Sequence, residues 1–230
     1  PQSLALSGVT DPYQPIEKRL ELTRRCLEVL ATFRNPVMIV TKNHLVTRDI
    51  DNLAALAEYD AASVALSITT LDPKLSAKLE PRASAPRRRL DAIHKLADAG
   101  IPVGVLTAPI IPGLNDPEVP ALLQAAAEHG ASFAGYTLLR LPGAVLPVFE
   151  DWLDQHAPLR KERVLARVRD IRGGKLNEAQ FGKRMRGQGT YAKQLSELFH
   201  LARRRAGLEK RGSKLSTAAF QRPGEHMGLF

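Results

Sequence analysis

The chain has 230 residues, a length that suits a single α/β domain with an appendage better than two domains of equal size. Its one cysteine excludes a disulfide framework, and it also excludes an all-cysteine metal or iron–sulfur site built from this chain alone. Residues 1–157 carry 15 Lys and Arg against 18 Asp and Glu, a net charge of −3, whereas residues 158–230 carry 18 against 6, a net charge of +12. The basic character therefore belongs to the last third of the chain.

The first strand and helix are predicted at the start of the chain. Leu4–Leu6 has the apolar character of a short strand, and a polar loop with Asp11 and Tyr13 follows it. Apolar residues then repeat every three or four positions, which predicts a helix from Ile16 to about Arg34. Cys26 stands at the flank of this apolar stripe, so we expect a buried thiol.

Three further strands, each followed by a helix, are predicted up to residue 130. The apolar runs Val37–Val40, Ser63–Thr70 and Ile101–Leu106 have the length of buried strands. Polar residues follow each run, and helices capped by Thr47, Ser84 and Asp116 come next. Gly100 lies where the second of these helices needs a left-handed residue. A loop that holds Glu80-Pro81-Arg82 precedes that helix, and an ion pair between Glu80 and Arg82 is the default expectation there.

The last strand, Phe133–Leu139, completes a series of five strands with four intervening helices. Right-handed crossovers between them predict a parallel sheet, open or curled into part of a barrel, with ligands at the carboxyl ends of its strands. From about Pro147 the pattern changes to helices alone, over Phe149–His156, Leu159–Ile171 and Tyr191–Arg205. Two segments are therefore expected: a barrel portion at 1–157 and a basic helical extension with a tail at 158–230, where Phe220 and the last apolar residues are candidate anchors.

Four strand ends carry a resemblance to a known family. These are Gly8-Val9-Thr10-Asp11-Pro12, Val40-Thr41-Lys42, Leu66-Ser67-Ile68-Thr69 with Glu80-Pro81, and Ala108-Pro109-Ile110-Ile111-Pro112-Gly113. Their order and spacing over residues 4–140 resemble the radical S-adenosylmethionine (radical SAM) enzymes, and most closely the spore photoproduct lyase-like subgroup. The resemblance implies a partial (βα) barrel, a lyase-like activity and two cofactors, S-adenosylmethionine and a [4Fe–4S] cluster. It also implies reductive cleavage of S-adenosylmethionine to a 5′-deoxyadenosyl radical, with a flavodoxin or ferredoxin type of protein as reductant.

The resemblance also assigns five cofactor-binding residues. Thr10 and Asp11 match the motif that meets the amino end of the methionyl group, and Lys42, Ser67 and Thr69 match strand ends that contact its carboxylate and the ribose. From the residues alone other roles stay open: a turn bond for Thr10 and Asp11, a solvated lysine at 42, and satisfied core hydroxyls at 67 and 69.

Two departures from the family pattern have consequences for function. The family's C-x3-C-x2-C loop and the strand before it do not occur, so we expect a fragment that begins after the cluster loop, with the cluster present in the full-length protein alone. Gly8 stands where the photoproduct lyases have a hydrogen-donating cysteine, and glycine has no S–H to donate. Catalytic residues and substrate are therefore not assigned, with nucleic acid as one candidate substrate.

The basic segment and Lys42 support two alternative functions. Arginines and lysines between residues 158 and 214 can follow DNA or RNA phosphates, with Phe181 and Tyr191 stacking on bases, as in a non-catalytic nucleic-acid-binding protein on a barrel scaffold; a solvated helical face is the other interpretation. An ordinary barrel lyase with Lys42 as an amine nucleophile is the second alternative. No apolar run is long enough for a membrane span and no signal peptide is visible, so a cytoplasmic location is expected.

Overall fold

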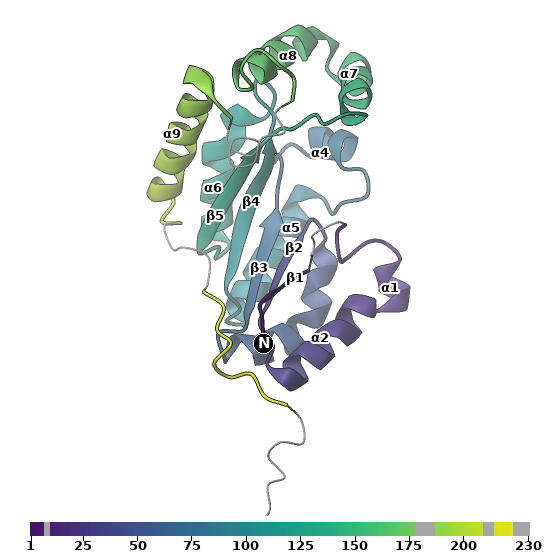
Figure 1. The fold of residues 1–230 in the computed structure, drawn as a ribbon, viewed down its shortest axis with the longest axis vertical. Coiled ribbons are helices and arrows are strands. Elements are labelled where there is room, and N and C mark those ends of the chain that lie inside the picture. Colours follow the sequence, from purple (N-terminus) through teal and green to yellow (C-terminus); the bar gives the residue numbers. More distant parts are fainter. Residues whose placement is uncertain (7–9, 178–186, 209–213, 223–230) are drawn as a thin grey trace, which may run out of the picture.

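The computed structural model describes residues 1–6, 10–177, 187–208 and 214–222. Its centre is a five-stranded sheet in which all neighbouring strands are parallel, in the order β1-β2-β3-β4-β5. The strands are β1 (Leu4–Leu6), β2 (Val37–Thr41), β3 (Ala62–Ser67), β4 (Val103–Ile110) and β5 (Phe133–Leu138). The predicted parallel α/β sheet with five strands is thus confirmed. Because all neighbouring strands are parallel, every strand's carboxyl end reaches the same edge of the sheet (Figure 1).

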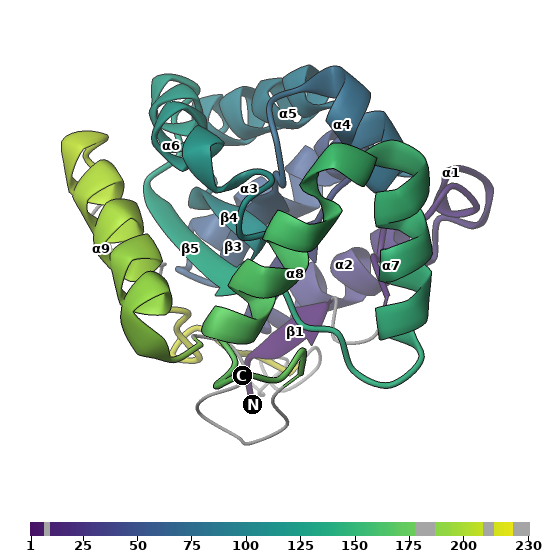
Figure 2. The ribbon, with the colours of Figure 1, turned by 90° about the horizontal axis from the view of Figure 1, so that it is seen from above.

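Helices connect the strands and cover one side of the sheet (Figures 1 and 2). The connections hold α1 (Glu17–Leu20), α2 (Leu22–Phe33), the short 3₁₀ helix η1 (His44–Asp49), α3 (Ile50–Ala57), α4 (Pro73–Leu79), α5 (Pro86–Asp98), the 3₁₀ helix η2 (Asp116–Glu118) and α6 (Val119–Glu128). The main apolar core lies between these helices and the strands, with Leu27, Ile39, Leu53, Val64 and Ile93 among its fully buried members.

Several predicted helix boundaries are wrong for local reasons. The helix expected from Ile16 to Arg34 breaks at Glu21, which adopts a left-handed φ of 49°. Thr47 does not cap α3, because it lies inside η1 and its hydroxyl donates to the carbonyl of His44. Ser84 does not cap α5 either, since its hydroxyl accepts a hydrogen bond from the backbone N–H of His44. Gly100 has the predicted left-handed conformation after α5.

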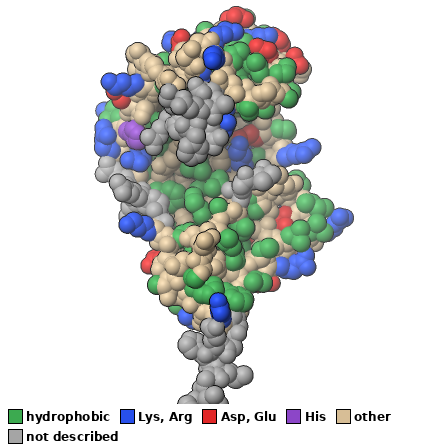
Figure 3. Space-filling model, viewed as in Figure 1, with side chains coloured by type: hydrophobic (Ala, Val, Ile, Leu, Met, Phe, Trp, Pro, Cys, Tyr) green, Lys and Arg blue, Asp and Glu red, His purple; other side chains and the backbone are tan. Residues whose placement is uncertain are grey.

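The predicted burial of the first helical stripe is also wrong in part. Cys26 is exposed, and Ile16 and Leu20 are 46% and 42% exposed. Leu22 and Val29 are exposed as well, so α1 and α2 present several apolar side chains to solvent. Figure 3 shows such side chains over α1. The break at Glu21 changes the helical phase, so residues before and after it do not share one buried face.

A helical cap follows β5 and lies over the carboxyl edge (Figure 2). It consists of α7 (Val145–His156), the 3₁₀ helix η3 (Pro158–Arg160) and α8 (Lys161–Asp170), and α9 (Gly189–Arg205) packs beside α6. A second apolar core joins α7 and α8 to the end of the sheet through Leu139, Phe149, Leu153, Val164 and Val168. Among the described residues, no helix combines the length and the apolar character that a membrane span needs.

The C-terminal tail docks at the opposite end of the sheet. The Phe220 ring lies 6.3 Å from that of Phe33, and the Gln221 backbone N–H donates to the carbonyl of Phe33. Phe220 is therefore the anchor that the sequence predicted. The other predicted tail anchors, together with Gly8 and Phe181, lie outside the described residues.

Candidate functional site

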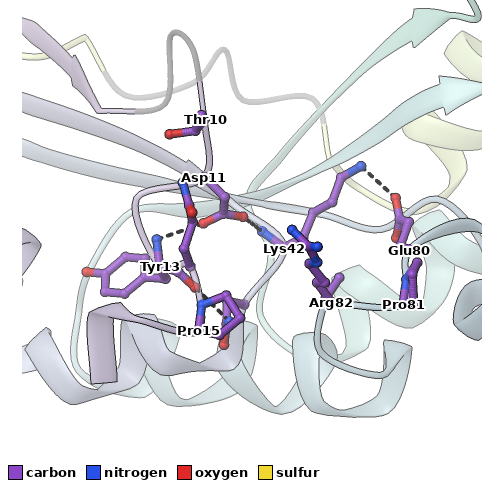
Figure 4. A pocket seen from close by; sticks show the side chains of 11 residues that line it. Thr10, Asp11, Tyr13, Pro15, Lys42, Glu80, Pro81 and Arg82 are labelled. Carbon is purple, nitrogen blue, oxygen red and sulfur yellow. Dashed lines mark hydrogen bonds and ion pairs between the residues drawn. The ribbon is translucent and has the colours of Figure 1, made fainter. Parts of the chain in front are cut away.

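A cavity of about 480 Å³ opens at the carboxyl ends of β1 and β2. Three segments form its wall (Figure 4). They are the loop after β1, the end of β2 and the loop after α4, which contribute Thr10, Asp11, Tyr13, Lys42, Glu80 and Arg82 among others. Three of the five predicted site residues therefore line one cavity.

The Asp11 carboxylate joins the loop after β1 to the end of β2. One of its oxygens accepts hydrogen bonds from the Tyr13 backbone N–H (2.9 Å) and the Thr41 hydroxyl (2.7 Å). The other accepts from the backbone N–H of Lys42 (2.7 Å). The turn bond expected for this loop is therefore present at Asp11. A carboxylate offers about four acceptor positions, so Asp11 retains capacity for one further donor.

Tyr13 fixes the floor of the cavity. Its ring is fully buried, and its hydroxyl donates to the Asp49 carboxylate at 3.0 Å. Burial, with the neighbouring Asp49 charge, raises the pKa of Tyr13 well above its usual value. The phenol is therefore neutral at physiological pH and acts as a rigid support. Arg24 and Arg48 bind the same buried carboxylate from α2 and η1.

Glu80 is the charged centre of the site. One carboxylate oxygen lies 2.5 Å from the Lys42 ammonium and accepts a 2.6 Å hydrogen bond from the Thr69 hydroxyl, and the other lies 2.7 Å from the Arg89 guanidinium. Burial opposes ionisation, but the charges of Arg89 and Lys42 prevail and hold the pKa of Glu80 below its usual value. The expected partner Arg82 is not among the ion pairs of Glu80 in the described part of the chain, and that prediction is wrong.

Arg89 anchors this centre to the sheet. Its side chain is fully buried on α5, and it donates to the carbonyls of Ser84 (2.6 Å) and Ser67 (2.8 Å) as well as pairing with Glu80. The sequence offered little sign of this role, because an arginine in the basic first turn of α5 has the pattern of a solvated residue. A buried ion pair with two backbone bonds fixes the loop after α4 relative to β3.

The two remaining predicted residues lie deeper in the sheet edge. Ser67 and Thr69 are 3% and 4% exposed, and the Ser67 hydroxyl donates to the carbonyl of Ala108 on β4 at 3.1 Å. The Thr69 hydroxyl lies 3.4 Å from the same carbonyl, but its one proton is donated to Glu80 at 2.6 Å. They share a side, as strand alternation predicts, and they are satisfied core hydroxyls. Thr69 also joins the Glu80 centre. The Asn115 side chain closes this edge, because its amide donates to the Thr69 carbonyl at 2.7 Å.

Part of the basic segment is used inside the protein. Arg172 is 2% exposed and donates to the carbonyls of Leu138 and Leu139, where β5 ends. The Tyr191 ring lies 4.3 Å from the Arg167 guanidinium, and its hydroxyl donates to the Asp116 carboxylate at 2.6 Å. Arg172 therefore does not belong to a solvated basic face, and Tyr191 supports the loop after β4.

A family comparison places this geometry in a known context. Residues 2–126 match the family model of the radical SAM superfamily, which is more than half of the chain. The chain belongs to the radical SAM superfamily. Membership implies S-adenosylmethionine and a [4Fe–4S] cluster as cofactors, and the resemblance inferred from the strand ends is confirmed at this level.

Curated relatives share sequence but carry no assigned function. An uncharacterized protein of Mycobacterium tuberculosis is 32% identical over 172 residues, which cover 74% of this chain and 49% of that protein. An uncharacterized protein of Acidianus two-tailed virus is 37% identical over 108 residues, which cover 46% of this chain and 34% of that protein. The chain thus spans about half the length of its mycobacterial relatives.

Solved structures show the same fold. A mutant of spore photoproduct lyase superposes with a TM-score of 0.63 at 17% identity, covering 90% of this chain and 59% of that one. A second mutant, with bound AdoMet and dinucleoside spore photoproduct, gives a TM-score of 0.61 at 18% identity, covering 89% and 58%. The sheet is therefore a partial barrel of the radical SAM type.

The residues present fit one implied cofactor and not the other. A [4Fe–4S] cluster needs several thiolates, whereas the sequence has a single cysteine, Cys26, which is exposed on α2. No cluster of three metal-ligating side chains occurs among the described residues. S-adenosylmethionine carries an ammonium and a carboxylate, and the cavity offers a carboxylate with spare acceptor capacity beside two cationic side chains, Lys42 and Arg82.

Proposed function

We propose that residues 1–157 form the S-adenosylmethionine-binding portion of a radical SAM enzyme that acts on an unknown substrate. The observation that carries the proposal is the cavity itself, where Asp11 and Lys42 from neighbouring strand ends meet Glu80 within the segment that matches the superfamily. In this superfamily the bound cofactor supplies a sulfonium whose reductive cleavage starts radical chemistry.

The charged groups of the cavity suit the two ends of the methionyl group. Asp11 would accept a hydrogen bond from the ammonium, because three of its four acceptor positions already hold donors that orient it. Arg82 lines the cavity with an exposed side chain, and a guanidinium can bind a carboxylate through two parallel hydrogen bonds. Lys42 adds a second cation, held in place by Glu80.

The hydroxyls of Ser67, Thr69 and Thr10 would bind the ribose. Ser67 donates to a backbone carbonyl and Thr69 donates to the Glu80 carboxylate, but each hydroxyl oxygen can still accept a hydrogen bond. Thr10 presents an exposed hydroxyl on the opposite wall. Thiolate ligands for a cluster would have to come from outside residues 1–230, because this sequence has one cysteine.

Isothermal titration of the 230-residue chain with S-adenosylmethionine tests the proposal. We expect saturable binding that Asp11→Asn weakens about tenfold or more, because a hydrogen bond to a charged group contributes about 1.5–3 kcal/mol. Asp98→Asn, on the exposed end of α5, is the matched control and should leave binding unchanged. Equal binding by both variants would exclude Asp11 as a contact, and no binding by the wild-type chain would argue against the proposed site.

A second experiment tests the enzyme class. Anaerobic reconstitution of the full-length gene product with iron and sulfide should give a cluster spectrum and reductive release of 5′-deoxyadenosine. A full-length open reading frame without a C-x3-C-x2-C motif would contradict the proposal.

The structure disfavours the Schiff-base alternative. An amine nucleophile needs a lone pair that is not engaged, whereas the Lys42 amino group is held 2.5 Å from the Glu80 carboxylate. Borohydride trapping of an adduct at Lys42 would instead support the Schiff-base alternative. Contact with DNA or RNA through residues 158–214 stays a proposal, and a steep salt dependence of nucleic-acid affinity is the measurement that tests it.

A further inference from the structure

A second cavity, of about 430 Å³, lies between α4 and the segment that joins α7 to α8. On one side α4 contributes Lys74, Leu75 and Lys78. On the other side the end of α7 and η3 contribute His156, Leu159 and Arg160. None of these residues belongs to the proposed cofactor site.

The rim of this cavity is positively charged. Lys74, Lys78 and Arg160 are all exposed, and none of them takes part in a recorded ion pair with another described residue. The cavity wall includes one carboxylate, Asp72, which is already committed to the N-cap of α4, where it accepts from the Lys74 backbone N–H at 2.8 Å. Three cations therefore surround the cavity with little compensation, and a negatively charged occupant is favoured.

The interior of the cavity is aliphatic. Leu75 and Leu114 extend from the second apolar core into its wall, and Ala157 and Pro158 continue the same surface. Leu159 at the rim is fully exposed, at 101% of its reference area. A large aliphatic side chain in this position loses water contact only when a partner covers it, which adds favourable burial to any complex.

The wall chemistry favours a peptide over a nucleic acid. Bases bind proteins largely by stacking on aromatic rings. The neighbouring Trp152 ring is already stacked on Phe149 at 6.0 Å with an interplanar angle of 3°, and the His156 ring packs edge-on against it. Aliphatic walls beneath a cationic rim instead suit an aliphatic side chain flanked by carboxylates.

We propose that this cavity docks an acidic peptide segment of a partner protein. An aliphatic side chain of that segment fills the space between Leu75 and Leu114, and its flanking Asp or Glu residues meet Lys74, Lys78 and Arg160. This inference does not depend on cofactor binding at the other cavity.

Trp152 provides the reporter for the test, because it is the only tryptophan of the sequence and its indole N–H donates to the Lys78 carbonyl at 3.0 Å. The 230-residue chain is titrated with a short acetylated peptide of alternating Glu and Leu, following Trp152 emission and the anisotropy of the labelled peptide. We expect saturable binding that the double variant Lys74→Glu/Lys78→Glu weakens about tenfold. The double variant Lys18→Glu/Lys193→Glu, with the same change of net charge on α1 and α9, should leave affinity within about twofold.

One further substitution sharpens the experiment. Leu159→Asp should weaken binding without unfolding the protein, since the side chain makes no buried contact. Three results would overturn the proposal: an equal loss in the control double variant, equal binding of a peptide with Gln in place of Glu, or tighter binding of a short oligothymidylate with the same dependence on Lys74 and Lys78.

Discussion

The two halves of the sheet's carboxyl edge are built in different ways. At the ends of β1, β2 and β3 the edge is open, and charged side chains around Glu80 surround a cavity. At the ends of β4 and β5 the edge is closed, because α7 and α8 bury it beneath a second apolar core and Arg172 binds the last strand carbonyls. One half thus presents a cavity lined by charged side chains, and the other half is packed beneath helices.

The short helix α4 connects the two halves. Its N-terminal part contacts the second core through Leu75, and its C-terminal cap residue is Glu80. Trp152 of α7 donates to the carbonyl of Lys78, which lies in the last turn of α4. Carbonyl groups in the last turn of a helix have no hydrogen-bond partner within that helix. The position of Glu80 therefore depends on the helical cap as well as on the sheet.

The largest effect is expected from breaking the charged centre of the open half. Arg89→Met leaves Glu80 buried without its guanidinium partner and removes two bonds to backbone carbonyls. We expect the free energy of unfolding to fall by about 3 kcal/mol, because loss of its buried partner leaves the Glu80 charge compensated by the partly exposed Lys42 alone. Urea denaturation followed by circular dichroism measures this change.

Arg87→Met is the matched control, since Arg87 is exposed on the same turn of α5. A change within about 0.5 kcal/mol is expected there. If both substitutions had the same small effect, the Glu80 centre would not stabilise the open half.

The next effect concerns pH and the Glu80 carboxylate. Glu80→Gln removes the charge that Arg89 and Lys42 stabilise, and we expect a loss of about 2 kcal/mol at neutral pH. Because the pKa of Glu80 is lowered in the folded state, this stabilisation is fully present above the unfolded-state value near 4.5 and is lost as pH falls through the folded-state value. The difference between wild type and variant should therefore shrink below about pH 4.5 in urea titrations. A difference that stays constant down to pH 3 would contradict the assignment.

The open half was the easier half to predict from the sequence. Apolar runs at Leu4–Leu6, Val37–Val40 and Ser63–Thr70 predict its strands, and parallel connection then brings Asp11 and Lys42 to one edge without further information. The Glu80 centre was missed in part because its partner Arg89 is nine residues away, beyond a turn. An ion pair with the nearby Arg82 was the local choice, whereas burial of Arg89 depends on tertiary packing.

The closed half was harder to predict from the sequence, because its structure depends more on tertiary contacts. The basic residues between 158 and 172 cannot be told apart by their sequence pattern. In the structure, however, Arg172 is buried against β5 while Arg160 is exposed. The same limit applies to the first helical stripe, where the break at Glu21 separates the exposed Ile16 and Leu20 from the buried Thr23 and Leu27. Periodicity assigns a face to a residue only while the helix continues without a break.

A smaller effect is expected where the two halves meet. Trp152→Phe keeps an aromatic ring on Phe149 but removes the hydrogen bond to the Lys78 carbonyl. We expect the free energy of unfolding to fall by about 1 kcal/mol. Differential scanning calorimetry measures the loss, and Trp152→Ala, which also removes the ring, should cost clearly more. Equal losses for the two variants would show that the hydrogen bond, and not the ring, carries the contact.

The smallest effect is expected in the closed half, at the contact between α9 and the loop after β4. Tyr191→Phe removes the hydroxyl that donates to Asp116, with an expected cost of about 0.5–1 kcal/mol at neutral pH. Burial, together with the hydrogen bond to Asp116, raises the pKa of Tyr191 to about 12. A raised pKa means that this stabilisation is complete below the unfolded-state value near 10 and is lost as pH rises towards 12. The gap in urea stability between the two proteins should therefore narrow as pH rises from 10 towards 12, and a gap that widens over this range would show that the tyrosine is not held as the neutral donor.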